Sequence, residues 1–315
     1  MGWWTLLSPS QFQGLFLPKE KNRRALRVQK KIILIYSNSL DPISQVLLEQ
    51  KDLVIPISVK SFLDSTEIFD QIREGVPQIS WTLIDGTVLQ NTDNFILVNR
   101  VLDLKKDLFN DFREEDREFA YQEFWAYLSF ALANFPLRTA TPTHLGLSGA
   151  NASLPIQWNI VSTSGEPITT PSFYYGPGKT LEAHLPLAES IISNLYSYNL
   201  WKPNGLKHVL SNDNVFAYRR PRGEPLSILT SGNQVMTKQS GSNNLPHFVT
   251  KTALKISELF SMGISEQLYF IDSDKITFGY ISPLVSTRMS QDKQFKTFII
   301  NSLQTVGQPH CEVSQ

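Results

Sequence analysis

The chain has 315 residues, enough for two domains of ordinary size or for one large α/β domain. Hydrophobic residues make up 41% and charged residues 18%, which excludes a disordered, collagen-like or coiled-coil chain. Lys plus Arg and Asp plus Glu number 29 each, so the formal net charge is zero and no global basic field attracts nucleic acid. We therefore expect no nucleic-acid partner.

Residues 1–30 are interpreted as an N-terminal arm. Trp3, Trp4, Phe12 and Phe16 form an aromatic cluster ahead of a basic stretch. Packing onto the protein's own domain is favoured over lipid anchoring, which normally needs a second signal. No positive segment precedes the apolar start, and no run of 18 apolar residues follows, so neither a signal peptide nor a membrane span is predicted.

Residues 31–136 are predicted to form an open α/β domain. The apolar run 32–36 is typical of a strand buried on both faces of a parallel sheet. Asp41-Pro42 predicts a helix start, because Asp caps the first turn and Pro fits its first position. The later expected elements are a strand over 53–57, a helix over 61–72, a hairpin of 81–84 and 88–89 around Asp85-Gly86, a strand over 95–98 and a helix over 114–134.

The long helix is predicted to end before Pro136 and to show a face of residues spaced at three and four. That face contains Phe119, Glu123, Ala126, Tyr127 and Phe130. Residues 137–204 then hold many Pro and Gly residues, which predict a long connection and a reduced central subdomain.

Residues 205–315 are predicted to form a C-terminal domain of antiparallel strands and helices. The expected elements are a hairpin of 206–210 and 215–219, a polar, mobile loop over 230–244, a helix over 248–262, a hairpin of 267–272 and 275–281, and a helix over 293–303. Cys311 is the single cysteine, so no intrachain disulfide or cysteine-based zinc site is expected. This favours a reducing, cytoplasmic setting.

Several local motifs occur along this order of elements. They are Lys31 to Ile35 with Asp41-Pro42, Trp81 before Asp85-Gly86, Val98-Asn99-Arg100, Asp116 to Trp125, Leu206 to Val209 with Val215 to Arg219, and Phe278 to Pro283. Together they resemble the ATP-grasp ligases, especially those that modify peptides, such as the microviridin-type maturases. The resemblance implies an α/β (α+β), ATP-grasp-like fold, a peptide or protein partner and, in an active member, ATP and magnesium.

The resemblance also implies where magnesium ligands belong. The family places an acidic residue on the first strand of the last hairpin, and a Glu and an Asn on the second, before a Pro. The matching positions here are Tyr269, Tyr280 and Ser282, none of which is a carboxylate. We interpret the three as degenerate metal positions. Asp272 and Asp274 at the turn are weaker metal candidates, and Glu266 lies close by.

Four basic residues are candidates for binding a nucleotide or another anion. Lys179 follows two glycines, although Pro177 and the spacing do not match a Walker loop. Lys202, Lys207 and Arg219 belong to a basic cluster with interleaved aromatic residues, and the resemblance implies a nucleotide-site arginine at Arg219. A solvated basic face is the equally weighted alternative.

The function hypothesis is a non-catalytic, ATP-grasp-like accessory protein of peptide or protein modification. One alternative is an active ATP-dependent carboxylate-amine ligase. Its metal would be held by Asp272 or Asp274, or by carboxylates from a partner. Another is a metal-independent sensor of nucleotides or phosphometabolites that uses Arg219. Whether the chain is an enzyme stays open at this point, as does a homodimer.

Overall fold

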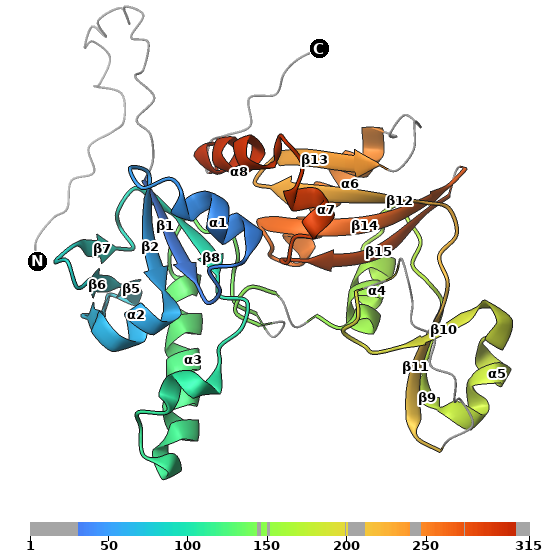
Figure 1. The fold of residues 1–315 in the computed structure, drawn as a ribbon, viewed down its shortest axis with the longest axis horizontal. Helices are drawn as coiled ribbons and strands as arrows, with labels where there is room; N and C mark the ends of the chain where they lie inside the picture. The colour runs from blue at the N-terminus through green and yellow to red at the C-terminus, as the bar shows by residue number, and fades with distance from the viewer. Residues whose placement is uncertain are drawn as a thin grey trace, which may run out of the picture.

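The described part of the chain covers residues 31–143, 146–149, 152–198, 200, 212–239, 247–273 and 275–306 of a computed structural model. A parallel three-stranded sheet lies on one side, an antiparallel four-stranded sheet on the other, and a small three-stranded sheet projects below the latter (Figure 1). The predicted mixed α/β class is confirmed. The N-terminal arm lies outside the described residues.

The parallel sheet has the order β2-β1-β8. Its strands are β1 (Lys31–Tyr36), β2 (Val54–Ser58) and β8 (Phe95–Arg100). Residues 32–35 are fully buried, so β1 is covered on both faces as predicted. Helix α1 (Pro42–Leu48) begins after Asp41, whose carboxylate accepts a hydrogen bond from the Ser44 N–H. The predicted helix start is confirmed.

The helix predicted over 61–72 is wrong beyond Ser65. Helix α2 (Val59–Ser65) is capped by the Ser58 hydroxyl, and the chain then becomes extended at Thr66. The Phe69 N–H donates to the Ser80 carbonyl oxygen, so pairing with a later strand replaces the helix. The short strands here are β3 (Glu67–Ile68), β4 (Gln71–Arg73), β5 (Val76–Gln78), β6 (Ser80–Thr82) and β7 (Val88–Gln90). Strands β6 and β7 confirm the predicted hairpin, with Gly86 at a φ of 80°.

The predicted long helix is confirmed as α3 (Arg117–Ala133), but the predicted face is not the buried one. It follows two 3-10 turns, η1 (Lys106–Phe109) and η2 (Glu114–Asp116). The buried residues are Phe124, Leu128, Ala131 and Leu132, whereas Phe119 and Phe130 are exposed. Both rows have helical spacing, and only packing against the sheet decides between them.

The region between residues 137 and 219 contains more regular structure than predicted. Its elements are α4 (Leu154–Thr163), β9 (Phe173–Pro177), η3 (Gly178–Thr180), α5 (Leu181–His184), η4 (Leu187–Glu189), β10 (Ser190–Ser193) and β11 (Asn214–Arg219). Strand β11 pairs with β10 on one edge and β9 on the other. The partner predicted for it, 206–210, lies outside the described residues.

The C-terminal sheet has the order β13-β12-β14-β15. Its elements are β12 (Glu224–Ser231), β13 (Gln234–Gln239), α6 (His247–Leu259), β14 (Ile264–Asp272), β15 (Lys275–Ser282), α7 (Thr287–Ser290) and α8 (Phe295–Gln304). The predicted helix over 248–262, the last hairpin and the closing helix are confirmed.

The polar loop predicted over 230–244 is wrong for residues 230–239, which belong to β12, its turn and β13. Thr230 is polar and yet fully buried. Its hydroxyl lies 2.7 Å from that of Ser257 and 2.9 Å from that of Ser265, so its hydrogen-bonding needs are met inside the protein. A polar strand of this kind lacks the hydrophobic alternation that would have identified it.

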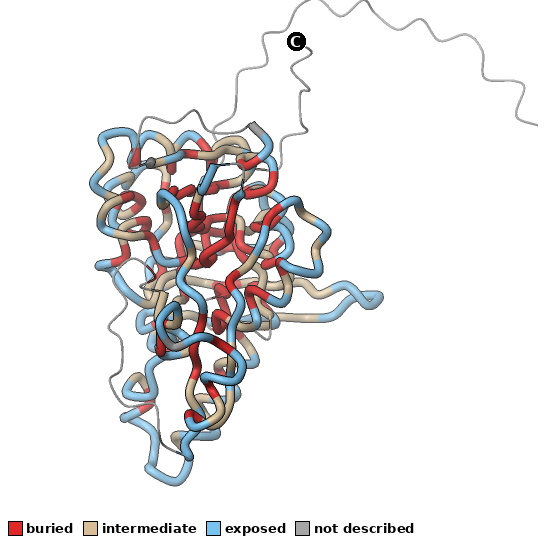
Figure 2. Tube along the Cα trace, turned by 90° about the vertical axis from the view of Figure 1, so that its right-hand side faces the viewer, coloured by how far each residue is buried: buried red, intermediate tan, exposed pale blue. Residues whose placement is uncertain are grey.

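The N-terminal and C-terminal sheets share a hydrophobic core. Ile32, Leu34 and Val98 from the first pack in one cluster with Leu229 and Ile264 from the second, together with α8. Buried segments gather in the middle of the body, and exposed ones follow the projecting loops (Figure 2). Within the described residues, no helix is both long enough and apolar enough to cross a membrane.

Candidate functional site

The last hairpin places the three proposed metal positions on two different faces. Glu266 lies opposite Ser282 and Leu268 opposite Tyr280, but the register then shifts, so that Tyr269 pairs with Phe278. Successive side chains of a strand point to opposite faces. Tyr269 therefore lies on the face away from Tyr280 and Ser282, and the structure does not bring the three together.

Tyr269 faces α6. Its side chain is fully buried, and its hydroxyl donates to Gln267 Oε1 at 2.5 Å. The Gln267 amide in turn donates to the Ala253 carbonyl oxygen in α6. Burial raises the pKa of Tyr269 well above its ordinary value, so the side chain stays a neutral phenol.

Tyr280 and Ser282 are both held in contacts within the protein. The Tyr280 ring stacks on Tyr198, with ring centroids 5.4 Å apart, and the Tyr198 hydroxyl donates to the Ala152 carbonyl oxygen. The Ser282 hydroxyl accepts a hydrogen bond from the Leu284 N–H at 3.0 Å. An aromatic ring and a hydroxyl that caps a turn thus occupy the positions at which the resemblance implies a carboxylate and an amide.

Glu266 is the buried carboxylate on this face, with 1% of its surface exposed. It accepts hydrogen bonds from the Ser286 N–H at 2.5 Å and the Ser286 hydroxyl at 2.8 Å. Burial raises the pKa of Glu266, and the Ser286 bonds oppose this only in part. Ser286 also caps α7, so the carboxylate acts as a structural acceptor at the helix start.

The hairpin does not fit a magnesium site. Mg²⁺ takes oxygen ligands in near-octahedral geometry and relies on carboxylates. Asp272 lies at the hairpin end, remote in register from Glu266, and Asp274 falls outside the described residues. Across the residues described, no three His, Cys, Asp or Glu side chains are grouped to hold a metal ion.

Glu266→Gln is expected to leave the free energy of unfolding at pH 7 nearly unchanged, whereas Glu266→Ala lowers it by about 1–3 kcal/mol. The amide oxygen of Gln can still accept from Ser286, but Ala leaves that buried N–H without a partner. The folded-state pKa of Glu266 is raised, so its contribution favours folding at low pH and is lost as pH rises through that pKa. Urea unfolding of wild type and Glu266→Gln at pH 4 and pH 7 measures this.

The result for Glu266→Gln distinguishes a structural acceptor from a required negative charge. As the pH falls toward 4, the free energy of unfolding of the wild type should rise relative to that of the Gln variant. A Gln variant as unstable at pH 7 as the Ala variant would contradict the structural assignment and would indicate a cation bound to the carboxylate.

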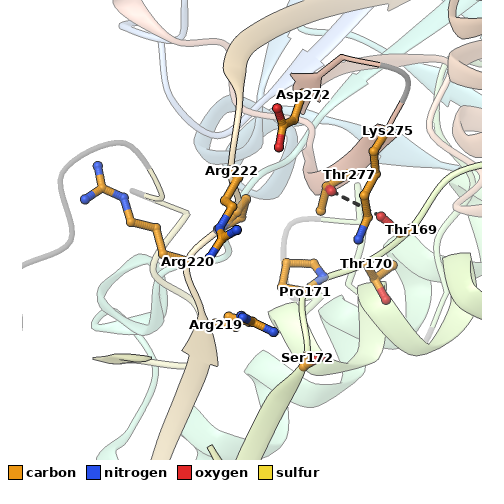
Figure 3. Close-up of a pocket in the computed structure, with 11 residues that line it drawn as sticks. Thr169, Thr170, Pro171, Ser172, Arg219, Arg220, Arg222, Asp272, Lys275 and Thr277 are labelled. Atoms are coloured by element: carbon orange, nitrogen blue, oxygen red, sulfur yellow. Dashed lines mark hydrogen bonds between the residues drawn. The ribbon is translucent and has the colours of Figure 1, made fainter. Parts of the chain in front are cut away.

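A polar cavity of about 290 Å³ lies at the connection between β11 and β12. Three segments meet there: residues 169–172 before β9, residues 219–222 at the end of β11 and just beyond it, and the hairpin end near Asp272 and Lys275 (Figure 3). Thr169 ties the first segment to β15, because its carbonyl oxygen accepts from the Phe278 N–H at 2.7 Å. The cavity thus lies between the central and the C-terminal sheets.

Arg219, predicted from the sequence, lines this cavity and carries an ion pair with Glu189. Arg222 Nη2 lies 3.8 Å from the same carboxylate. Lys275 was predicted only as the first residue of the second strand of the last hairpin, and not as a binding residue. In Figure 3 its amino group points toward Thr170. Lys275 and Arg219 come from segments 56 positions apart, a separation that no local pattern reveals.

The other candidate residues are not brought into this cavity. Lys179 is exposed in η3 of the central subdomain and does not line the cavity. Lys202 and Lys207 lie outside the described residues. Of the four predicted anion-binding residues, Arg219 is therefore the one that the described structure places in a cavity with other basic side chains.

Comparisons with known proteins identify the fold. No protein-family model matches the chain, and no curated protein matches it. Among solved structures, the macrocyclase MdnC from Microcystis aeruginosa, bound with precursor peptide MdnA, aligns with a TM-score of 0.65 at 13% identity. That alignment covers 88% of this chain and 99% of MdnC.

Two further ATP-grasp ligases align over the same share of this chain. The ATP-grasp ligase PsnB, complexed with minimal precursor, has a TM-score of 0.62 at 13% identity, with 88% of this chain and 99% of PsnB covered. A RiPP-associated ATP-grasp ligase from Chryseobacterium gregarium has a TM-score of 0.60 at 10% identity, with 88% and 96% covered. The chain therefore has the ATP-grasp fold, and the fold implied by the sequence resemblance is confirmed.

Proposed function

We propose that this chain binds a peptide or protein partner in a peptide-modification system and does not catalyse magnesium-dependent ATP chemistry. The last hairpin carries the proposal. Its face holds Tyr280 and Ser282 in internal contacts, and its buried carboxylate, Glu266, is committed to Ser286. Acyl phosphate formation from ATP needs a magnesium-neutralised triphosphate, and this face supplies too few ligands for it.

A polypeptide partner is supported by the relatives and by the protein's surface. MdnC and PsnB were both solved with precursor peptides, as was the Chryseobacterium gregarium ligase with leader and core peptide. In this chain, large apolar side chains are exposed in the region from β3 to β7. They are Ile68, Phe69, Ile72, Val76, Ile84 and Val88. A contiguous exposed apolar surface marks an interaction site in soluble proteins, and these six side chains come from one stretch of short strands and turns. A cytoplasmic setting and a homodimer stay predictions.

Thermal unfolding with ATP or ADP, each with and without magnesium, tests the proposal. A ligand that binds only the folded state raises its stability by mass action. We expect no magnesium-dependent rise in Tm at millimolar nucleotide. A rise of several degrees that requires magnesium would contradict the proposal and support the active ligase, with Asp272→Ala as the first variant to examine.

A further inference from the structure

The cavity at the β11–β12 connection has a second, adjoining cavity with which it shares three arginines. The first has a volume of about 290 Å³ and the second about 410 Å³. Both are lined by Arg219, Arg220 and Arg222, and the first also by Lys275. We propose that the first cavity, hereafter the hinge pocket, binds the dianionic group of a phosphomonoester without a metal ion.

The charge of the hinge pocket fits a dianion. Four basic side chains line it or its neighbour, and the acidic side chains are Asp272 and Glu189. The two carboxylates leave an excess of two positive charges. A phosphomonoester carries a charge of about −1.5 to −2 at neutral pH, so one such group balances the pocket. A single carboxylate would leave it positively charged.

The contacts already present show how an oxyanion can be held. In the adjoining cavity, Arg219 binds the Glu189 carboxylate and Arg222 approaches it, so two guanidinium groups converge on one oxyanion beside the hinge pocket. Guanidinium groups match the geometry of phosphate oxygens as well as that of carboxylates. Because Arg222 Nη2 is 3.8 Å from Glu189, beyond hydrogen-bonding distance, it is available to a second anion.

Lys275 supplies a positive charge from the opposite wall. No ion pair of Lys275 is found among the described residues, and its amino group points toward Thr170 at the pocket (Figure 3). Thr170 and Ser172 also line the hinge pocket, and their hydroxyls can donate to phosphate oxygens, whereas the Thr169 hydroxyl already donates to the Ile276 carbonyl oxygen. Arginine from one segment and lysine with hydroxyls from the others therefore surround the space.

The walls of the hinge pocket are fixed before any ligand binds. Thr169 is joined to β15 through hydrogen bonds on both its N–H and its carbonyl oxygen. Gly223 follows the arginines at a φ of 99°, and a Cβ there would lie 2.2 Å from the Ile271 carbonyl oxygen. Pro171 and Pro221 further restrict the two segments. The backbone of these segments therefore has little freedom to lose on binding, whereas the exposed side chain of Arg222 has to be ordered by the anion.

The phosphate group can come from a small molecule or from a phosphorylated side chain of a polypeptide. Titrations with three probes in the presence of EDTA distinguish these sources. Binding is measured by calorimetry and by the rise in Tm. The probes are inorganic phosphate, glycerol phosphate, and a phosphoserine peptide beside its unphosphorylated match. We expect saturable binding of at least one phosphorylated probe, and none of the unphosphorylated peptide.

The double variant Arg222→Ala with Lys275→Ala should raise the Kd at least tenfold. Lys296→Ala is the matched control, because Lys296 is half-exposed and paired with Glu49 on a different surface. Unchanged binding in the double variant, no binding of any phosphorylated probe, or an equal Tm rise with sodium chloride at the same ionic strength would overturn the inference. A magnesium-dependent nucleotide shift would instead contradict the proposed function and leave this measurement in EDTA unaffected.

Discussion

Replacing Arg100 by alanine is expected to lower the free energy of unfolding by about 3–5 kcal/mol, because it leaves a buried carboxylate without its partner. Arg100 is 1% exposed. Its Nε donates to Asp41 at 2.9 Å, and its Nη2 donates to the other carboxylate oxygen at 2.5 Å and to the Pro283 carbonyl oxygen at 2.8 Å. The loss therefore affects the parallel sheet and its junction with the C-terminal domain. Urea unfolding at pH 7 measures it.

The pH dependence of Arg100→Ala gives a second, independent test. Burial alone would raise the pKa of Asp41, but Arg100 and the Ser44 hydrogen bonds outweigh it and hold that pKa below its ordinary value. In the wild type, this contribution is present above the ordinary pKa of Asp41 and is lost as pH falls through the lowered value. Without Arg100 only burial and the Ser44 hydrogen bonds act on Asp41, so its carboxylate is protonated at a higher pH than in the wild type. The loss in the free energy of unfolding caused by Arg100→Ala should therefore become smaller toward pH 4.

A double variant separates the pair itself from the unpaired charge. Arg100→Met combined with Asp41→Asn removes both charges but keeps an oxygen that can accept from the Ser44 N–H at the start of α1, and it should be less destabilised than Arg100→Ala alone. If Arg100→Ala lowers the free energy of unfolding at pH 7 by less than about 1 kcal/mol, water reaches Asp41 and the ion pair is not buried between the two sheets.

Trp158→Ala is expected to cost about 3–5 kcal/mol, the range for removing a large aromatic side chain from a core. Trp158 is fully buried in α4, and its Nε1 donates to the Gly279 carbonyl oxygen of β15 at 2.7 Å. Its ring packs against Tyr218, with centroids 5.4 Å apart, and against Phe216. One side chain thus connects α4, the central sheet and the C-terminal sheet. Urea unfolding at pH 7 measures the loss.

Two other tryptophan variants provide comparisons for the loss of stability in Trp158→Ala. Trp158→Phe keeps an aromatic ring but leaves the Gly279 carbonyl oxygen without its donor, so it should cost less, about 1–3 kcal/mol. Trp125 is only partly buried on α3, and Trp125→Ala should cost less than Trp158→Ala. If both alanine variants lower the free energy of unfolding equally, Trp158 does not connect α4 and the two sheets in the way that its contacts indicate.

Sequence patterns predicted the elements whose local signals agree with their packing. The run 32–36 is apolar at every position because β1 is covered on both faces, and Asp41-Pro42 carries its own cap. The polar strand end at Thr230 could not be predicted in this way, because its side chain is satisfied only by Ser257 and Ser265 from other elements.

The candidate site was predicted less completely than the fold. Placing Tyr269 beside Tyr280 assumed an uninterrupted register, whereas the pairing shifts between Leu268 and Tyr269. The shift leaves Gly279 of β15 without a pairing partner, and an isolated glycine inside a strand is the local sequence sign of such a bulge. Arg219 was identified by its basic neighbours, but Lys275 joins it only through the fold.

The contacts that α4 makes with β15 determine where the C-terminal sheet can accept another strand. Gln157 accepts from the Ile281 N–H at 2.8 Å, Trp158 binds the Gly279 carbonyl oxygen, and Thr169 bonds to Ile276 and Phe278. The outer edge of β15 is therefore closed to strand addition. Within the described residues, β13 is the strand at the opposite edge of the sheet, and its Lys238 forms an ion pair with Asp292. A polypeptide that extends this sheet by backbone pairing would have to join at β13.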